Sequence, residues 1–163
     1  AQSYQKLFSD EGKAQSKEGK KKSENETTRW GSGKMLSEKP RVKVTDSTVS
    51  MEVTYKAKQD LKSAILGFSV YGPGGQNILE ENTRNLRRKV GPINNGDKIK
   101  TTWEIPNIFA SGNYDISVAC CDESATEFYD WLNHAGNFSV RKEYQTSGAV
   151  NPGVQLTKIE RVE

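Results

Sequence analysis

Six side chains in this sequence have the chemistry to recognise a sugar. The aromatic candidates are Tyr71, Tyr129 and Trp131, and the hydrogen-bonding candidates are Asp115, Ser117 and Asp130. An aromatic ring can stack on the apolar C–H face of a pyranose, while carboxylate and hydroxyl groups bond its rim of hydroxyls. The alternative for Tyr129 and Trp131 is simple packing at the end of the protein core, and the sequence leaves both interpretations open.

A second candidate is a basic segment, Asn82–Lys89, with the sequence NTRNLRRK. Its candidate ligand-binding residues are Asn82, Thr83, Arg84, Arg87 and Arg88. Arginine pairs bidentately with carboxylate or phosphate, so this segment could hold an anionic group on a sugar. The competing interpretation is a solvated edge strand, in which the charges prevent aggregation.

Signals for catalysis are weak. His134 is the only histidine, so a histidine cluster cannot bind zinc. The turn Gly72–Gly75 is not followed by the Lys-Ser/Thr of a phosphate-binding loop, and no serine sits in a nucleophile-elbow pattern. We therefore expect a binding protein that is not an enzyme and that needs no metal or other cofactor.

The elements that would position these residues are strands. The segment WEIPNIFASGNYDISV, residues 103–118, contains two alternating apolar patterns separated by a corner. Within it, Gly112-Asn113-Tyr114 resembles the tyrosine corner of immunoglobulin-like sandwiches, in which a tyrosine hydroxyl bonds back to the preceding turn. Because Tyr114 faces the core in this pattern, Asp115 and Ser117 should alternate outward.

Period-two patterns recur along the rest of the chain. The expected strands are 40–44, 49–55, 64–71, 76–81, 98–105, 113–121, 126–132 and 137–140, with one more in the tail through Val154, Leu156 and Ile159. We expect the core to contain Val49, Met51, Val53, Leu66, Phe68, Val70, Ile99, Trp103, Tyr114, Ile116, Val118, Phe138 and Val140. Short strands at this spacing with no long helix predict an all-β fold, an immunoglobulin-like antiparallel sandwich.

Composition divides the chain into two parts. Residues 1–29 carry seven Lys/Arg and five Asp/Glu among small polar residues, which predicts a flexible linker before a sandwich domain at 30–163. The domain keeps 17 basic and 16 acidic residues, so a nucleic-acid partner is not expected. The adjacent Cys120 and Cys121 should point to opposite faces of a strand, one in the core and one outward, without a disulfide.

Four segments in succession carry a family resemblance. They are RWGSGK at Arg29–Lys34, ILGFSVYGPGGQNILEENT at Ile65–Thr83, IPNIFASGNYDISVA at Ile105–Ala119 and YDWLNHAGNFSV at Tyr129–Val140. In this order and spacing the chain resembles the C-terminal domain of Wzt-type proteins, the ATP-binding subunits of ABC exporters for bacterial O-antigen polysaccharide. Asn82 and Thr83 match the pair after the hairpin, and Asp130 matches the acidic position before the last core strand.

The resemblance implies a carbohydrate-binding domain that recognises the capped non-reducing end of the polysaccharide before export. It also implies a homodimer that can exchange C-terminal strands, and contact with the transporter's membrane subunit through a separate ATPase domain. The expected location is cytoplasmic, at the inner face of the bacterial inner membrane. The alternative function is a structural or dimerisation module whose sheet binds protein.

Overall fold

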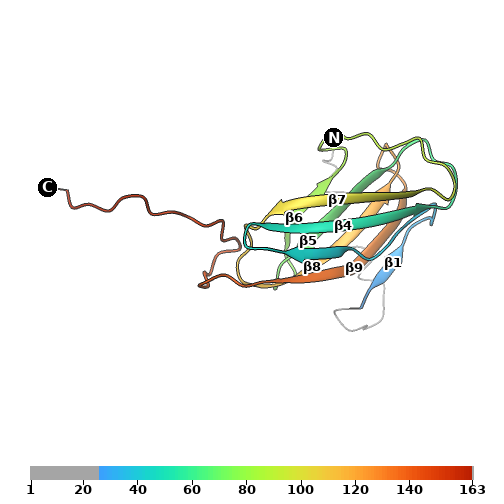
Figure 1. The fold of residues 1–163 in the computed structure, drawn as a ribbon. Coiled ribbons are helices and arrows are strands. Elements are labelled where there is room, and N and C mark those ends of the chain that lie inside the picture. Colours follow the sequence, from blue (N-terminus) through green and yellow to red (C-terminus); the bar gives the residue numbers. More distant parts are fainter. Residues whose placement is uncertain (1–25, 163) are drawn as a thin grey trace.

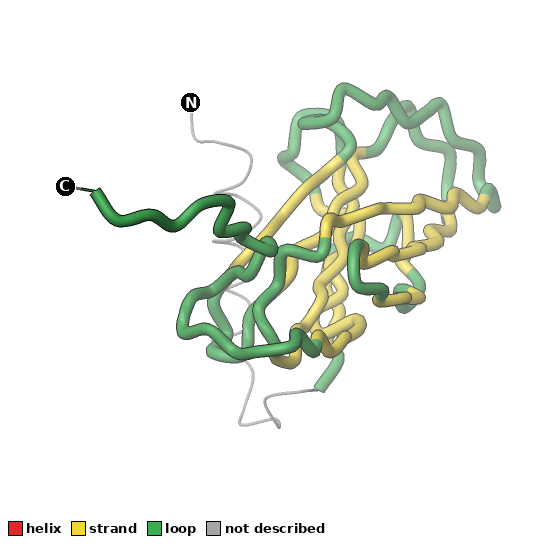
Figure 2. Tube along the Cα trace, turned by 60° about the vertical axis from the view of Figure 1, so that its left-hand side comes forward, coloured by secondary structure: helices red, strands yellow, loops and turns green. Residues whose placement is uncertain are grey.

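The computed structural model describes residues 26–162, which form nine strands and, in this range, no helix (Figures 1 and 2). The strands are Thr28–Trp30 (β1), Met35–Ser37 (β2), Arg41–Val44 (β3), Thr48–Ala57 (β4), Ile65–Tyr71 (β5), Asn77–Asn82 (β6), Lys98–Pro106 (β7), Gly112–Cys121 (β8) and Phe128–Val140 (β9). The expected all-β fold is confirmed.

The strands make two antiparallel sheets that pack face to face. One sheet has five strands in the order β1-β9-β8-β5-β6, and in the other β4 pairs with β2, β3 and β7. All of these pairings are antiparallel, as the immunoglobulin-like sandwich predicts. The long connection between β6 and β7 crosses from one sheet to the other along one side of the molecule (Figure 1).

The core lies between the sheets and follows the predicted alternation. In β4, Val49, Met51, Val53 and Tyr55 are buried, and their neighbours on the outer face are partly exposed. Eleven of the thirteen predicted core residues are buried, while Ile99 and Trp103 are partly buried against the core. β5 is buried on both faces, as expected from apolar residues at consecutive positions.

The tyrosine corner is confirmed. Tyr114 at the start of β8 donates a hydrogen bond from its hydroxyl to the carbonyl oxygen of Ala110, at 2.6 Å. Its ring stacks on Phe138 of β9, with centroids 5.2 Å apart. The corner therefore fixes how the chain turns from β7 in one sheet into β8 in the other.

β9 differs from the sequence prediction, which gave two separate strands at 126–132 and 137–140. The structure has one continuous strand, and its pairing with β8 shifts between Ile116 and Val118. Three residues of β9 face this one position of β8, and among them His134 has a φ of 49°. A bulge accommodates the polar Asn133-His134 pair, so the segment between the two predicted strands remains part of the sheet.

The expected C-terminal strand is wrong for the single chain. After an isolated bridge between Phe109 and Val150 and a hydrogen bond from the Asn151 amide to the Ile108 carbonyl at 2.6 Å, residues 152–162 form no strand and extend away from the sandwich (Figure 1). Val154, Leu156 and Ile159 are 79–87% exposed. An extended segment forms a strand only where a neighbouring strand accepts its backbone hydrogen bonds, and the folded chain provides no such neighbour here.

The structure refines two further expectations in the five-stranded sheet. Thr28 and Arg29 belong to β1, which pairs with β9, while residues 1–25 of the expected linker lie outside the described range. Cys120 lies in the main core and Cys121 on the opposite, outer face of the sheet, as predicted, but Cys121 is fully buried there. It packs in a second small core with Trp131 and Phe128 on the outer face of the sheet.

Candidate functional site

The outer face of the five-stranded sheet brings several predicted residues together where β5 pairs with β8. Tyr71 lies opposite Asp115, and Ser69 lies opposite Ser117. Their neighbours in β8, Tyr114 and Ile116, are in the main core, so Asp115 and Ser117 do alternate outward as predicted. Tyr71, Asp115 and Ser117 thus share a face.

A hydrogen-bond network orders the middle of this face. Ser117 donates from its hydroxyl to the amide oxygen of Asn133 on β9, at 2.8 Å, and Ser69 and Ser117 are only 1% and 2% exposed. Burial raises the pKa of Tyr71 above its ordinary value, against the opposing effect of hydrogen bonds with Ser69 and Ser117. Tyr71 is therefore a neutral hydroxyl at physiological pH, able to donate or accept a hydrogen bond.

Next to this network, at the tyrosine-corner end of the sandwich, is an open hollow of about 750 Å³ that we call the polar pocket. It is lined by Gly72, Pro73, Ser111, Gly112, Asn113, Tyr114, Asp115, His134, Asn137, Phe138, Ser139 and Gln145. None of these described lining residues is a lysine or arginine. Its size is within the range of about 300–1,000 Å³ that is usual for ligand sites.

Asp115 and His134 form a close side-chain pair in the polar pocket. The Nδ1 atom of His134 lies 3.2 Å from the Oδ2 atom of Asp115, and both side chains are about one-third exposed. The bulge in β9 produces this pair, because it places His134 beside Asp115 from a backbone conformation that non-glycine residues seldom adopt. A strained residue of this kind is often found at binding sites.

The polar pocket can form many directional hydrogen bonds without binding an anion strongly. It presents amide groups from Asn113, Asn137 and Gln145, and Ser139 donates to the amide oxygen of Asn113 at 2.7 Å. Carboxylate and amide groups match the alternating donors and acceptors of a sugar's hydroxyls. The chemistry of the lining therefore suits a neutral, hydroxyl-rich ligand.

Trp131 and Tyr129 offer no stacking surface in this structure. Trp131 is 1% exposed, and Trp30 of β1 stacks on it with ring centroids 5.7 Å apart and planes 11° from parallel. Tyr129 is 6% exposed and belongs to the main core, where burial raises its pKa to about 12. Both residues pack the end of the sheet opposite to the polar pocket, as the alternative interpretation allowed.

Asp130 is an internal ion-pair partner rather than part of an open rim. It is 1% exposed, its Oδ1 atom lies 3.1 Å from Nε of Arg29, and its Oδ2 atom accepts a hydrogen bond from the Ser37 amide at 2.7 Å. Burial raises the pKa of Asp130, and the bonds from Ser37 and Arg29 only partly offset that effect. Asp130 thus ties β9 to β1 and to β2 of the other sheet.

The remaining predicted residues lie together after β6. Asn82 and Thr83 are buried and bond the backbone: Asn82 accepts from the Asn85 amide at 2.9 Å and Thr83 accepts from the Leu66 amide at 3.1 Å. Arg84, Arg87 and Arg88 are exposed. The edge strand expected for this segment is wrong beyond Asn82, because residues 83–87 form a turn.

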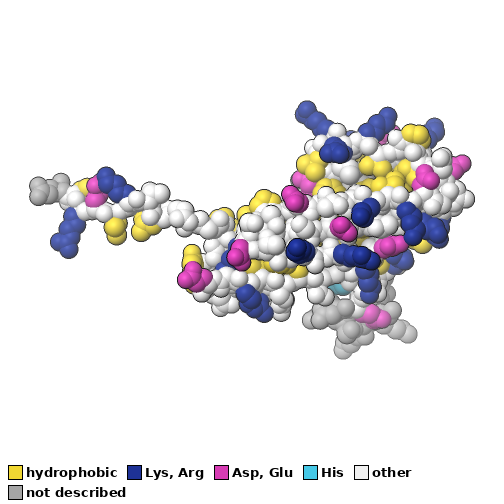
Figure 3. All heavy atoms as spheres, in the orientation of Figure 1, with side chains coloured by type: hydrophobic (Ala, Val, Ile, Leu, Met, Phe, Trp, Pro, Cys, Tyr) yellow, Lys and Arg dark blue, Asp and Glu magenta, His cyan; other side chains and the backbone are white. Residues whose placement is uncertain are grey.

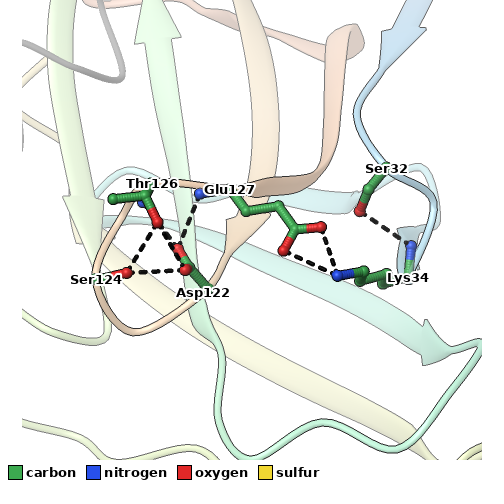
Figure 4. Close-up of polar contacts among 6 residues, drawn as sticks. All are labelled: Ser32, Lys34, Asp122, Ser124, Thr126 and Glu127. Atoms are coloured by element: carbon green, nitrogen blue, oxygen red, sulfur yellow. Dashed lines mark hydrogen bonds and ion pairs between the residues drawn. The ribbon is translucent and has the colours of Figure 1, made fainter.

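A separate polar cluster stabilises the β8–β9 connection. Asp122 accepts hydrogen bonds from the Thr126 and Glu127 amides and from the Ser124 hydroxyl, while Glu127 pairs with Lys34 at 2.7 Å (Figure 4). Burial by itself would raise the pKa of Asp122, but these hydrogen bonds lower it. Both carboxylate oxygens of Asp122 accept hydrogen bonds from within the turn, so this cluster is structural.

Sequence reasoning missed most of the polar pocket. In the sequence, His134 stands out only as a potential zinc ligand, and Asn137 and Ser139 only as strand residues. The signal that could have revealed them is their alternation with Phe138, which places Asn137 and Ser139 on the face opposite to the core. Within residues 26–162, no three His, Cys, Asp or Glu side chains come together in a way that could hold a metal ion.

The comparisons with known proteins point to one family. A family model described as the Wzt C-terminal domain matches residues 26–152. A crystal structure of the C-terminal domain of Wzt superposes with a TM-score of 0.72 at 16% identity, covering 82% of this chain and 89% of that one. No curated protein sequence matches the chain.

Two further solved structures that match are less similar. β-Glucosidase 3B from Thermotoga neapolitana gives a TM-score of 0.44 at 14% identity, over 66% of this chain and 16% of the enzyme. The putative ApaA protein from Bordetella pertussis gives 0.32 at 12% identity, over 66% and 92%. Likenesses this distant do not bear on the function of the chain.

Because the family model covers most of its length, the chain belongs to the Wzt C-terminal domain family. The part of the chain that the structure describes contains no helix of the length and hydrophobicity needed to span a bilayer.

Proposed function

We propose that this domain binds the capped non-reducing end of an O-antigen polysaccharide and thereby selects finished chains for export, without catalysing a reaction. Membership of the Wzt C-terminal domain family supports a role in an O-antigen ABC transporter. The observation that carries the finer proposal is the polar pocket, which combines a hydroxyl-binding lining with a size suited to a small part of a glycan.

In this proposal, the Asp115–His134 pair is the main hydrogen-bonding element. Asp115 accepts from sugar hydroxyls, and His134 fixes the orientation of that carboxylate. Asn113 of β8 and Asn137 of β9 bind neighbouring hydroxyls of the sugar. Tyr71 of β5 extends the binding surface toward the middle of the sheet. A pocket at the end of a sandwich suits a chain terminus, because the polysaccharide can continue from it into solvent.

The domain would act beside its transporter. We infer that it lies on the cytoplasmic side of the inner membrane as a peripheral part of the exporter, joined through a separate ATPase domain to the membrane subunit. The near-neutral folded part supports a polysaccharide partner over a nucleic acid, because a nucleic-acid site would need a basic face.

A homodimer with exchanged C-terminal strands belongs to the same proposal. The tail leaves Val154, Leu156, Ile159 and Val162 79–87% exposed, which a strand paired on a second copy would cover (Figure 3). The segment that leads from β9 into the tail starts beside the polar pocket, because the Lys142 amide donates to the hydroxyl of Ser111, one of its lining residues, at 2.7 Å. The same exposed residues favour the alternative function, a dimerisation module that binds protein and no glycan.

The experiment is a calorimetric titration of the domain with capped and uncapped forms of the same oligosaccharide. We expect the capped form to bind at least about tenfold more tightly, and Asp115→Ala to lose most of that binding. Asp46→Ala removes an exposed carboxylate in the β3–β4 turn and is the matched control. Equal affinity for the two forms would rule out cap recognition.

Sedimentation of the same protein separates the two functions. A dimer that binds the capped glycan supports the proposal, whereas a dimer without any glycan binding supports the dimerisation module.

A further inference from the structure

The loop after β6 carries a dense positive charge on a turn whose two ends are hydrogen-bonded to β5 and its neighbouring residues. We call Thr83–Lys89 the arginine turn, and its cations are Arg84, Arg87, Arg88 and Lys89, all of them exposed. Figure 3 shows dark-blue side chains along the upper edge of the molecule, where Figure 1 shows the connection between β6 and β7. Within residues 26–162, Arg87, Arg88 and Lys89 form no ion pair.

Both ends of the arginine turn are fixed to the sheet. At its start, the Thr83 amide donates to the Leu66 carbonyl at 2.9 Å, and the Thr83 hydroxyl accepts from the Leu66 amide. Just beyond its end, the Val90 carbonyl accepts from the Ala64 amide at 3.0 Å. The cations are therefore held close together by the backbone, against their mutual repulsion.

Arg87 adds an unusual conformation to this charge. Its φ is 55°, in the left-handed region that glycine and asparagine occupy most easily. Its amide donates to the Arg84 carbonyl at 3.0 Å, which closes the turn. A strained arginine where glycine would fit better suggests that the side chain itself is used.

The arginine turn forms one wall of a hollow of about 310 Å³. The other walls are Ser63, Ala64, Ile65 and Glu123, and the Ser63 hydroxyl donates to a carboxylate oxygen of Glu123 at 3.3 Å. Four cations thus surround a space that contains a single carboxylate. The excess of positive charge in this concave surface attracts an anion of more than one charge.

A second hollow, of about 320 Å³, adjoins the first along the same turn. It shares Thr83, Arg88, Lys89 and Val90 with the first hollow and adds Trp103, Thr101 and Thr102 of β7. Trp103 is only partly buried, and its Nε1 atom donates to the Thr101 hydroxyl at 3.0 Å, which fixes the indole plane. An ordered indole beside hydroxyl groups is a surface on which a sugar ring can stack.

We propose that the arginine turn binds a sugar phosphate, with the phosphoryl group between Arg87 and Arg88 and the sugar ring against Trp103. A phosphate monoester carries a charge of about −1.5 to −2 and has three acceptor oxygens. It can therefore accept hydrogen bonds from several guanidinium groups at once, which makes it a better ligand for this turn than a carboxylate with two oxygens. This site is distinct from the polar pocket, because the two lie toward opposite ends of β5, about 20 Å apart.

The test uses the domain with glucose 6-phosphate, glucose and inorganic phosphate, each titrated while the Trp103 indole N–H resonance is followed by NMR. We expect glucose 6-phosphate to bind and shift this resonance, glucose to leave it unchanged, and inorganic phosphate to bind at least about tenfold more weakly than glucose 6-phosphate. The double variant Arg87→Ala/Arg88→Ala should weaken glucose 6-phosphate binding at least tenfold. Arg41→Ala, an exposed arginine on β3, is the matched control and should bind as the wild type does.

Three results of the titrations would overturn the proposal. They are an absence of glucose 6-phosphate binding, binding that the double variant leaves intact, and equal affinity for inorganic phosphate. Binding to phosphatidylglycerol vesicles without binding of glucose 6-phosphate would also overturn it, in favour of a lipid surface. Asp115→Ala should leave glucose 6-phosphate affinity unchanged, so the failure of this site and of the glycan pocket can be told apart.

Discussion

The outer face of the five-stranded sheet has a closed end and an open end, although β8 and β9 run through both. At the closed end, Trp131, Phe128 and Cys121 form a small second core beneath Trp30. At the open end, Asp115 and His134 line the polar pocket. The difference is β1, which pairs with β9 only between Trp131 and Asn133 and so covers only one end.

This contrast shows that one sheet face can serve two purposes. Where an extra strand adds an aromatic cover, burial of large apolar side chains stabilises the fold. Where the cover ends, polar side chains remain free to bind a ligand. Substitutions at the two ends should therefore separate stability from binding, with the largest loss of stability at the closed end and the smallest at the open end.

At the closed end, Trp131→Ala should lower the free energy of unfolding by about 3–5 kcal/mol, because it removes a buried ring that contacts Trp30 and Phe128. Urea denaturation measures the change. Tyr144→Ala, which removes an aromatic ring that is 57% exposed, is the control and should cost less than about 0.5 kcal/mol. A loss of under about 1 kcal/mol for Trp131→Ala would mean that the closed end contributes little to stability.

Asp130→Asn should destabilise the fold by about 1–3 kcal/mol at low pH, because it replaces one of the two carboxyl oxygens that face the Ser37 amide and the Arg29 guanidinium by an NH2 group, which cannot accept a hydrogen bond. The raised pKa of Asp130 means that the folded protein binds its proton more tightly than the unfolded chain does. The stabilisation that protonated Asp130 contributes is fully present below the pKa that Asp130 has in the unfolded chain. It is lost as the pH rises through the higher pKa that Asp130 has in the folded protein.

The stability advantage of the wild type over Asp130→Asn should thus shrink from acidic to neutral pH, as measured by thermal unfolding in a series of buffers. An advantage that grows over the same range would show that the Arg29 ion pair outweighs burial.

At the boundary of the open end, Tyr114→Phe should cost on the order of 1 kcal/mol, because it removes the hydroxyl that bonds the Ala110 carbonyl. Thermal unfolding detects this change as a lower melting temperature. If the melting temperature stays the same, the hydroxyl does not stabilise the corner.

At the open end, Asp115→Ala should change stability by no more than about 0.5 kcal/mol, since the side chain is partly exposed and pairs only with His134. The comparison of the two ends depends on this small value. Urea denaturation beside Trp131→Ala measures it, and a cost above about 2 kcal/mol would make the open end structural as well.

Much of the fold could be predicted from local patterns. The alternation in β4 and the two-faced β5 identified buried strands, and Gly112-Asn113-Tyr114 identified the tyrosine corner. These features depend on neighbours within a few residues, where side-chain direction follows directly from the pleat of a strand. The outward direction of Asp115 and Ser117 came from the same rule.

The site was harder to predict because exposure depends on distant segments. Trp131 and Asp115 look equally available in the sequence, but β1, about a hundred residues earlier in the chain, covers only the first. His134 reaches Asp115 through a bulge that exists only because β9 pairs with β8 in a shifted register. Similarly, the side chains of Asn82 and Thr83 are buried and already hydrogen-bonded, that of Asn82 to the arginine turn and that of Thr83 to β5.

The sequence by itself determined which residues form strands, which faces of those strands are apolar, and where the chain turns between sheets. The tertiary structure alone decided which outer surface stays open, because that depends on which strand lies at each edge and how far along the sheet it extends. Alternation specifies the side of a strand on which a residue lies, whereas accessibility depends on everything that packs over that side.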